Sequence, residues 1–521
     1  MGLYVNPGNQ GFAAIRKGTY VDKSGLISLV NRTLGTAGKL TCISRPRRFG
    51  KSFAAQMLTA YYDRSCDSRS LFADLAIANA PDFETHRNRY DVLCVDMTGI
   101  LADAPDKLQV VSFLKDTLVQ ELRRCWPDAE REETLTGTLY QTVRHTGVPF
   151  VCIIDEWDVL FREMDDVRVQ EEYIELLRAL FKNINLTNQV FTGVYMTGIL
   201  PIRKYRHQSA VSDFQEYTMV DPSIYAEYVG FTEADVRSLC GQYGADFEEL
   251  KKWYDGYVFP QAGSIYNPSS VMKALERRSL QSYWVATTAY DSLRVYIDMD
   301  FEGVQEAIIS MLGGSPCKVD TYLFENDLQH IDSRDAMLTL LIHLGYLSYD
   351  LEKSEASIPN EEIRREFIRS IRHGKREELA ALVRNSDSLL RAVLEGDEAR
   401  VAEAVAGVHE TGVAPLYYND EQSLRYVIRF AFLSAVDEYV RIEELPSGRG
   451  YADVVYLPKK QSALPALVVE LKWDKPVEAA IDQIRDRRYP SVLEQYGGEV
   501  VLVGITYNAA TKEHVCRLER V

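Results

Sequence analysis

The stretch "KLTCISRPRRFGKSFAAQMLTAYY", from Lys39 to Tyr62, decides the fold of the N-terminal part of the chain. Its apolar start predicts a strand, its Pro and Gly predict a loop, and its later apolar residues recur at helical spacing. A loop between a strand and a helix binds phosphate through backbone N–H groups and the positive helix N-terminus. We therefore expect a nucleotide-binding strand, loop and helix here.

The loop matches the second half of a well-known phosphate-binding pattern. In G-x-x-x-x-G-K-[ST], the lysine contacts the β- and γ-phosphates and the hydroxyl binds Mg²⁺. Arg45 occupies the place of the first glycine, so the loop is expected to open with ordinary backbone geometry next to Pro46. The alternative is a polar helix start without a ligand. The residues predicted to bind ATP here are Arg47, Arg48, Phe49, Gly50, Lys51 and Ser52.

The motif "VCIIDEWD" supplies the acids that such a site needs. We expect Asp155, at the end of an apolar strand, to hold Mg²⁺ together with Ser52, and Glu156 to orient the attacking water as a catalytic residue. An acidic pair that complements a helix dipole is the alternative interpretation. Thr197 closes a later strand and is predicted to sense the γ-phosphate. Arg203, Lys204 and Arg206 follow it and either stabilise transferred charge or form a solvated basic turn.

Apolar runs at 92–97, 150–155 and 190–199, separated by helical segments, predict a doubly wound parallel sheet. The next region is mostly helical, and residues 333–372 suggest a small winged-helix-like module. After it, helices precede a hairpin, a helix and a final strand, which form a separate α/β domain. The predicted domains are residues 1–220, 221–375 and 376–521.

The C-terminal hairpin "YADVVYLPKKQSALPALVVELKW" carries the second group of functional residues. If its strands pair about the polar turn, Asp453 lies directly opposite Glu470, and Lys472 shares the face of Glu470 while Val469 and Leu471 point into the core. Two facing carboxylates bind Mg²⁺, which activates water for phosphodiester cleavage, and the lysine positions that water. The alternative is a solvated sheet edge.

Composition limits the remaining classes. The 521 residues include 46% hydrophobic ones, enough for several cores, and the net charge of −17 argues against general coating of DNA. No apolar stretch reaches the roughly 18 residues that span a bilayer. We therefore expect a cytoplasmic protein without membrane contact.

Several segments together resemble one family over nearly the whole chain: "TYVDKSGLI", "SRPRRFGKS", "IIDEWD", "FTGVYMTGIL", "VGFTEADV", "KWYDGY" and "YNPSSV". They are similar to bacterial AAA-ATPase-like proteins that carry a C-terminal PD-(D/E)XK nuclease-like domain. Within that family the loop itself resembles RPRRFGKS. Two departures are Trp157, where tyrosine is usual, and the stretch "YRHQSAVSDFQEY".

The resemblance implies a P-loop NTPase domain of AAA/STAND-like type, a helical lid with a winged-helix-like region, and a restriction-endonuclease-like α/β domain. It also implies that Glu421 completes a metal site with Asp453 and Glu470, with Lys472 as a catalytic residue. Gln483 lies on the following helix, whose Arg485, Arg487, Arg488 and Tyr489 contact a nucleic-acid backbone or form an ordinary charged surface.

Two functions remain open from the sequence. The first is an ATPase, dependent on ATP and Mg²⁺, that controls a nuclease acting on DNA or RNA in defence or mobile-element control. The second is a nucleotide-dependent switch whose C-terminal domain binds nucleic acid or a partner without cutting. Related ATPases often complete their site with a neighbour's arginine, so homo-oligomers are among the expected assemblies.

Overall fold

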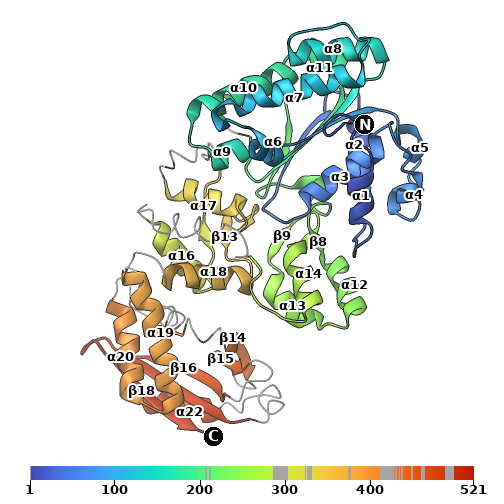
Figure 1. Cartoon of the computed structure of the whole chain (residues 1–521). Helices are drawn as coiled ribbons and strands as arrows, with labels where there is room; N and C mark the ends of the chain where they lie inside the picture. Colours follow the sequence, from blue (N-terminus) through green and yellow to red (C-terminus); the bar gives the residue numbers. More distant parts are fainter. Residues whose placement is uncertain are drawn as a thin grey trace. The chain divides into compact units, whose positions relative to one another are not determined.

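The computed structural model describes the chain except for residues 1, 203, 206–207, 210–212, 285–302, 323, 325–330, 332, 373–376, 411–427, 429–430, 433–434, 436–437, 448–449, 459–463 and 487–497. It also leaves undescribed the side chains of 204–205, 208–209, 306, 372, 377–383, 408–410, 440–447 and 450–453. Two compact units are present (Figure 1). The first comprises Met1–Trp284 and Lys318–Ile363, and the second comprises Val285–Cys317 and Arg364–Val521. Residues 221–284 and 318–363 thus pack with the N-terminal part, while the three-domain division stays a prediction.

A five-stranded sheet with the order β2-β3-β4-β1-β7 forms the centre of the first unit, and every neighbouring pair in it is parallel. The predicted strands are present because continuous apolar runs suit strands buried on both faces. The carboxyl ends of β3, β4 and β1 lie side by side at one edge. The strands are β1 (Leu40–Ser44), β2 (Asp91–Asp96), β3 (Phe150–Asp155), β4 (Phe191–Gly198) and β7 (Gln215–Tyr217).

Helices lie on both faces of this sheet, as the doubly wound prediction requires (Figure 1). The shorter connections include 3₁₀ turns at Ala76–Asn79, Lys107–Gln109 and Ser223–Tyr225, and the small strands β5 (Lys204–Tyr205) and β6 (Gln208–Ser209). The helices are α1 (Gln10–Ile15), α2 (Gly25–Thr33), α3 (Lys51–Tyr62), α4 (Arg69–Phe72), α5 (Phe83–His86), α6 (Met97–Asp103), α7 (Val110–Cys125), α8 (Leu135–Thr146), α9 (Val159–Glu163), α10 (Val167–Phe181) and α11 (Ile184–Val190).

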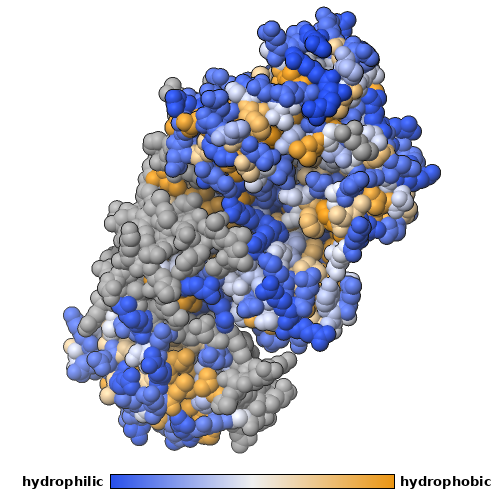
Figure 2. Space-filling view, viewed as in Figure 1, coloured by the Kyte–Doolittle hydropathy of each residue, from blue (hydrophilic) through white to orange (hydrophobic). Residues whose placement is uncertain are grey.

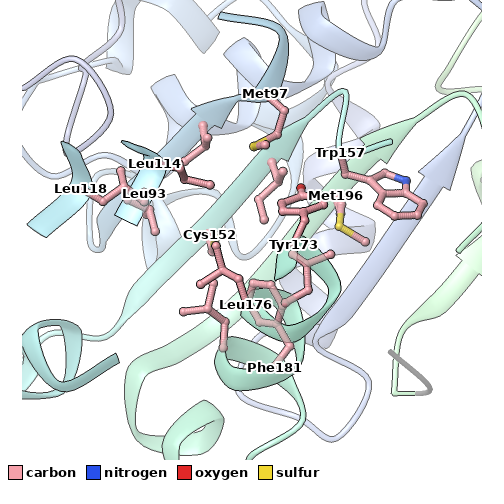
Figure 3. Close-up of a cluster of buried hydrophobic side chains, with 14 of the residues drawn as sticks. Leu93, Met97, Leu114, Leu118, Cys152, Trp157, Tyr173, Leu176, Phe181 and Met196 are labelled. Atoms are coloured by element: carbon pink, nitrogen blue, oxygen red, sulfur yellow. The ribbon is translucent and has the colours of Figure 1, made fainter. Parts of the chain in front are cut away.

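One face of the sheet packs against α7 and α10 to form a large hydrophobic core (Figure 3). Cys152 and Met196 project from the central strands toward Tyr173 and Phe181 of α10. Trp157, directly after the strand that carries the acids, is 1% exposed and packs in this core. The core therefore fixes the backbone that presents Asp155 and Glu156.

A second group of elements, residues 231–277, follows the sheet in the first unit, and we call it the α12–α14 module. Helix α12 begins with a capping box in which Thr232 and Asp235 satisfy each other's backbone N–H groups. Helix α14 is capped by Asn267, whose side chain accepts from two N–H groups of the first turn. The elements are β8 (Phe231–Thr232), α12 (Glu233–Tyr243), α13 (Phe247–Tyr254), β9 (Tyr257–Phe259), β10 (Gly263–Tyr266) and α14 (Pro268–Arg277), with the strand order β8-β10-β9.

The winged-helix-like prediction for 333–372 expected a helix, a strand pair and a helix, and all three are present. Helix α17 spans Arg334–His343, and β12 (Ser348–Asp350) pairs antiparallel with β13 (Glu355–Ser357). Helix α18 spans Glu361–Arg372, and the boundary between the first and second units falls within it. The chain also passes from one unit to the other at the short strand β11 (Cys317–Lys318).

The second unit is built around a five-stranded mixed sheet with the order β14-β15-β16-β17-β18. Only β16 and β17 are parallel, and they are joined by α22, as a crossover connection requires. The predicted hairpin and final strand are present, and β14 and β18 extend the sheet on either side. The elements are α16 (Val304–Leu312), α19 (Glu377–Glu395), α20 (Glu398–Glu410), β14 (Tyr439–Ser447), β15 (Gly450–Pro458), β16 (Ala466–Trp473), α22 (Val477–Asp486), β17 (Val500–Asn508) and β18 (Glu513–Arg520).

Within the described part of the chain, no helix combines the length and the apolar character needed to cross a bilayer. Charged and polar residues cover most of the visible surface, and hydrophobic residues gather between α3 and the α12–α14 module (Figure 2).

Candidate functional site

The phosphate loop connects β1 to α3 and takes two left-handed backbone conformations. Gly50 has a φ of 95°, which suits a residue without Cβ, and α3 begins at the next residue. Arg48 has a φ of 69°, an uncommon geometry for a side-chain-bearing residue. Arg45 is absent from the positive-φ residues, so the expected ordinary entry geometry is confirmed. The loop therefore needs glycine only where the helix begins.

Lys51 turns its side chain back under the loop. Its side chain is 3% exposed, and its Nζ donates to the carbonyl oxygens of Arg45 and Pro46, both at 3.1 Å. The same Nζ lies 3.2 Å from a carboxylate oxygen of Glu156. The ammonium thus joins the loop to Glu156, the acid that follows β3.

Glu156 follows β3 in a left-handed conformation with a φ of 54°. Its second carboxylate oxygen accepts from Arg162 of α9 at 2.6 Å. Burial alone would raise the pKa of Glu156, but the Lys51 ammonium and the Arg162 guanidinium outweigh it and hold the pKa below its usual range. Glu156 is therefore an ionised acceptor at neutral pH, in a backbone geometry that tends to occur at functional sites.

Asp155, Ser52 and Thr197 form a second polar group at the same sheet edge. The Thr197 hydroxyl donates to the Asp155 carboxylate. Burial raises the pKa of Asp155, and hydrogen bonds from the Ser52 and Thr197 hydroxyls oppose that rise. A carboxylate beside a serine hydroxyl is an oxygen donor set of the kind that Mg²⁺ prefers. The described residues thus fit the predicted metal site.

Two residues of this region were missed by the sequence analysis. Asp158 is fully buried, and its Oδ2 accepts the backbone N–H groups of Ile199 and Leu200 at 3.1 and 2.9 Å. The same oxygen accepts from Arg162 Nε at 3.0 Å. The i,i+4 spacing of Asp158 and Arg162 is the signal that would have revealed the pair. Together they fix the backbone that follows β4 and the side chain that holds Glu156.

Gly198 provides a stability test of this arrangement. A Cβ at Gly198 would lie 2.6 Å from two indole atoms of Trp157 and 2.8 Å from Asp158 Oδ1. Because both neighbours are buried, we expect Gly198→Ala to lower the free energy of unfolding by about 1–3 kcal/mol, the usual range for overpacking. Gly241 of α12 is the control, since nothing lies within 4 Å of its Cβ position. Denaturant unfolding should show Gly241→Ala unchanged or up to about 1 kcal/mol more stable; equal behaviour of the two variants would contradict the crowding argument.

A cavity of about 490 Å³ opens beside the loop in the first unit. Its volume lies in the usual range for small-molecule sites. Lys51, Ser52 and Glu156 line its polar end. Many of the other lining side chains are apolar or aromatic and come from the N-terminal segment, α3 and the α12–α14 module, including Tyr20, Val21, Phe53, Met57, Phe231 and Met272. The cavity combines a cationic, hydroxyl-bearing end with an apolar body.

The side chains of Arg48 and Phe49 contact the α12–α14 module and the segment after it, whereas Arg47 contacts α9. Arg48 donates from Nη1 to the Tyr283 carbonyl at 3.0 Å, and Phe49 packs edge-on against Tyr257 with ring centroids 5.5 Å apart. Arg47 lies 3.5 Å from Glu163. Arg48 and Phe49 also line the cavity. Side chains of the loop thus contact the α12–α14 module, the segment after it and α9, while Arg48 and Phe49 also border the cavity.

In the second unit, β15 and β16 pair in the expected register, with Val454 opposite Val469 and Val455 opposite Val468. Extending this register by one step would bring Asp453 opposite Glu470, so this pairing stays a prediction. Lys472 lies 3.2 Å from Glu470 Oε1, and the Gln483 side-chain amide of α22 donates to the same oxygen. Three polar residues therefore meet under α22.

Both faces of this strand are buried. Val469 and Leu471 were predicted to point into the core and are buried, and Glu470 and Lys472 on the other face are only 1% and 7% exposed. The reason is that α22 covers their face: Ile481 and Ile484 pack against Val468 on the same side. The pair lies in a covered pocket of the sheet and is not a solvated edge.

Several predicted residues lie outside what the structure describes. These are the side chains of Asp453 and Lys204, and the whole of Glu421, Arg203, Arg206, Arg487, Arg488 and Tyr489. Arg485 is described, and it forms an ion pair of 2.5 Å with Glu519. Among the described side chains, no three of His, Cys, Asp or Glu group as metal ligands. The metal site of the second unit stays a prediction.

Comparisons with known proteins were made on sequence and on structure. Residues 7–206 match the AAA-ATPase_like family model, described as predicted AAA-ATPase. No curated protein matches significantly. Among solved structures, AMPPCP-bound DnaA from Aquifex aeolicus has 10% identity and a TM-score of 0.26, covering 63% of this chain and 80% of that one. The Aeropyrum pernix Orc1 protein in complex with DNA has 12% identity and a TM-score of 0.24, covering 85% and 91%. The matched residues 7–206, which hold the Gly50-Lys51-Ser52 loop and the Asp155-Glu156 pair, are therefore similar to predicted AAA-ATPases.

Proposed function

We propose that the protein binds and hydrolyses ATP in the cavity of the first unit, and that its second unit is a Mg²⁺-dependent phosphodiesterase acting on DNA or RNA under the control of that ATPase. The convergence of Lys51, Ser52 and Glu156 on one cavity carries the proposal. The match of residues 7–206 to predicted AAA-ATPases supports it.

Each group at the polar end has a distinct role in ATP hydrolysis. The backbone N–H groups of the loop and the Lys51 ammonium bind the phosphates. Ser52 and Asp155 would hold Mg²⁺, which neutralises phosphate charge when bound. Glu156, ionised at neutral pH, orients the attacking water and accepts its proton. Thr197 fixes the Asp155 carboxylate through its hydroxyl and takes the position from which a γ-phosphate is sensed.

The apolar body of the cavity suits the base of the nucleotide. Val21, Met57, Phe231 and Met272 offer apolar and polarizable surface to a flat ring, as is usual for cofactor sites. These residues come from the N-terminal segment, α3 and the α12–α14 module, so a nucleotide bound there would contact three parts of the first unit.

For the second unit, the proposal is supported by the contact between Glu470 and Lys472 and by the β15–β16 register, and Asp453 is the proposed second carboxylate. Facing carboxylates suit Mg²⁺, and Lys472 positions the water that attacks the phosphodiester. Glu421 is the proposed further ligand. A homo-oligomer would allow a neighbouring copy to complete the ATP site with an arginine.

The nuclease proposal is tested by replacing Glu470. We expect Glu470→Gln and Asp453→Ala to reduce Mg²⁺-dependent cleavage of labelled single- and double-stranded DNA and RNA by at least about tenfold, because removing a charged ligand weakens the metal site. Glu513→Gln, an exposed change on β18, is the matched control and should cleave as the wild type does. Cleavage that persists in both Glu470→Gln and Asp453→Ala would contradict the site.

A second function is favoured by one observation. Glu470 already contacts the Lys472 ammonium at 3.2 Å, so the buried carboxylate has a counter-ion without metal. This arrangement suits a nucleotide-dependent switch whose second unit binds nucleic acid or a partner without cutting. ATP binding with no cleavage of any substrate by the wild type would support the switch.

A further inference from the structure

Arg45, which stands where the phosphate loop usually begins with glycine, is fully buried. Its Nη1 donates to three backbone carbonyls: Ser44 at 2.9 Å, Thr218 at 2.8 Å and Tyr217 at 3.4 Å. Its guanidinium lies 5.6 Å from the ring centroid of Phe259. One side chain thus joins the start of the loop to the end of β7 and to β9 of the α12–α14 module.

Burying the Arg45 guanidinium has a free-energy cost that an apolar side chain of similar size would not have. Burial lowers the pKa of Arg45 to about 10, so the side chain still carries its charge at neutral pH. In the described part of the chain, no carboxylate pairs with it, and its Nε and Nη2 lack hydrogen-bond partners. Replacing buried charges by apolar groups of similar volume is often neutral or stabilising. Stability alone therefore does not explain an arginine at this position.

The backbone hydrogen bonds of Arg45 show which parts of the site its side chain holds in position. Its carbonyl oxygen accepts from Lys51 Nζ at 3.1 Å, and its N–H donates to the Gly198 carbonyl at 3.0 Å. The residue therefore touches the phosphate-binding lysine on one side and the end of β4 on the other. Any shift of Arg45 would move the carbonyl that orients Lys51.

We propose that Arg45 is a positioning residue for nucleotide binding: it fastens the start of the phosphate loop to Tyr217, Thr218 and Phe259, and so holds Lys51 and the loop N–H groups ready for phosphate. The inference rests on the proposed ATP site and deepens it. It assigns to the arginine the task that close backbone packing at a glycine performs in the usual loop.

Further contacts along the loop support the same conclusion. The Pro46 ring packs directly on the Gly345 backbone, because a Cβ at Gly345 would lie 2.6 Å from Pro46 Cγ. The Asn267 side chain donates to the Arg47 carbonyl at 3.4 Å. The loop is thus bound along its outer side by residues far away in sequence, and Arg45 is the buried anchor at its first position.

The test compares Arg45→Met with Arg69→Met, an exposed arginine on α4 whose side chain is 67% exposed. Binding of a fluorescent ATP analogue is titrated with Mg²⁺ present, and turnover is measured at saturating ATP. We expect Arg45→Met to raise the Kd at least tenfold while kcat changes less than threefold and the Tm of the ligand-free protein does not fall. Arg69→Met should match the wild type in Kd, kcat and Tm.

Two further variants keep the test decisive if Arg45→Met does not fold. Arg45→Lys retains the charge without the planar fork, and Phe259→Leu removes the ring from a different strand. Each should raise the Kd severalfold, and hydrogen exchange should speed up in residues 45–52. A purely structural Arg45 would instead lower the ligand-free Tm and leave the Kd of the folded protein unchanged.

The outcomes separate this inference from the proposed function. If the wild type binds ATP, Lys51→Ala does not, and both Arg45 variants bind as the wild type does, the positioning role is wrong while the ATP site stands. If the wild type itself binds no ATP, the proposed function fails, and the role of Arg45 falls with it.

Discussion

The change Lys51→Ala is expected to weaken Mg·ATP binding by about 100-fold, which corresponds to about 2.7 kcal/mol. The lysine supplies a buried charge-assisted contact to phosphate, and alanine cannot replace it. The change also removes the 3.2 Å ion pair with Glu156 and the donor to the Arg45 and Pro46 carbonyls. Calorimetric titration of ATP into both proteins measures the effect directly.

A matched control tests whether removing any lysine that donates to backbone carbonyls is enough to abolish ATP binding. Lys107 also donates from Nζ to two backbone carbonyls, those of Leu101 and Ala102, and it does not line the cavity. Lys107→Ala should bind ATP with the affinity of the wild type. An affinity for ATP that is the same in Lys51→Ala and in the wild type would show that the phosphate-loop assignment is incorrect.

Turnover is expected to fall by about 100- to 1000-fold in Glu156→Gln, with the ATP affinity within a few fold of that of the wild type. General bases contribute rate factors of this order, and glutamine keeps the shape of glutamate but accepts no proton. Lys51 and Arg162 hold the pKa of Glu156 below its usual range, so this base stays ionised down to pH values below that range. Wild-type turnover should therefore not be limited by protonation of Glu156 until the pH is that low. Steady-state assays across pH, with binding measured separately, provide the readout.

Glu172→Gln is the control for this prediction. Glu172 lies on α10, is exposed and does not line the cavity. The substitution makes the same chemical change elsewhere in the first unit and should leave kcat unchanged. If Glu156→Gln and the wild type turn over ATP at the same rate, Glu156 is not the catalytic base. If the variant instead loses much of its ATP affinity, Glu156 contributes to binding and not to the chemical step.

The parts predicted from the sequence share one property: their signal is local. Strand β1 and helix α3 were expected because an apolar run, a glycine and helical spacing all fall within 24 residues. The pairing of β15 with β16 was expected because the hairpin's own turn sets the register. Asp155 and Glu156 were predicted as site residues because they lie at the end of an apolar strand, and β3 does end at Asp155.

The parts that were not predicted depend on contacts between distant residues. A basic residue next to proline gives no sign that Arg45 is buried, because its partner Thr218 lies 173 residues further on. Likewise, the alternation of β16 suggested one covered face, and only the packing of α22 shows that Glu470 is buried too. Periodicity shows which face is apolar, but it does not show which polar face a helix will cover.

The phosphate loop packs on its outer side against residues far downstream in the chain, and this affects when the loop can fold during synthesis. Its packing partner Gly345 is about 300 residues downstream of Pro46, and the Gly345 carbonyl also accepts from the Tyr257 hydroxyl at 2.5 Å. At roughly 5–20 residues per second, a ribosome needs on the order of 15–60 s to make the intervening chain. The nascent loop spends that time without its final neighbours, so the nucleotide site is among the last parts of the first unit to mature.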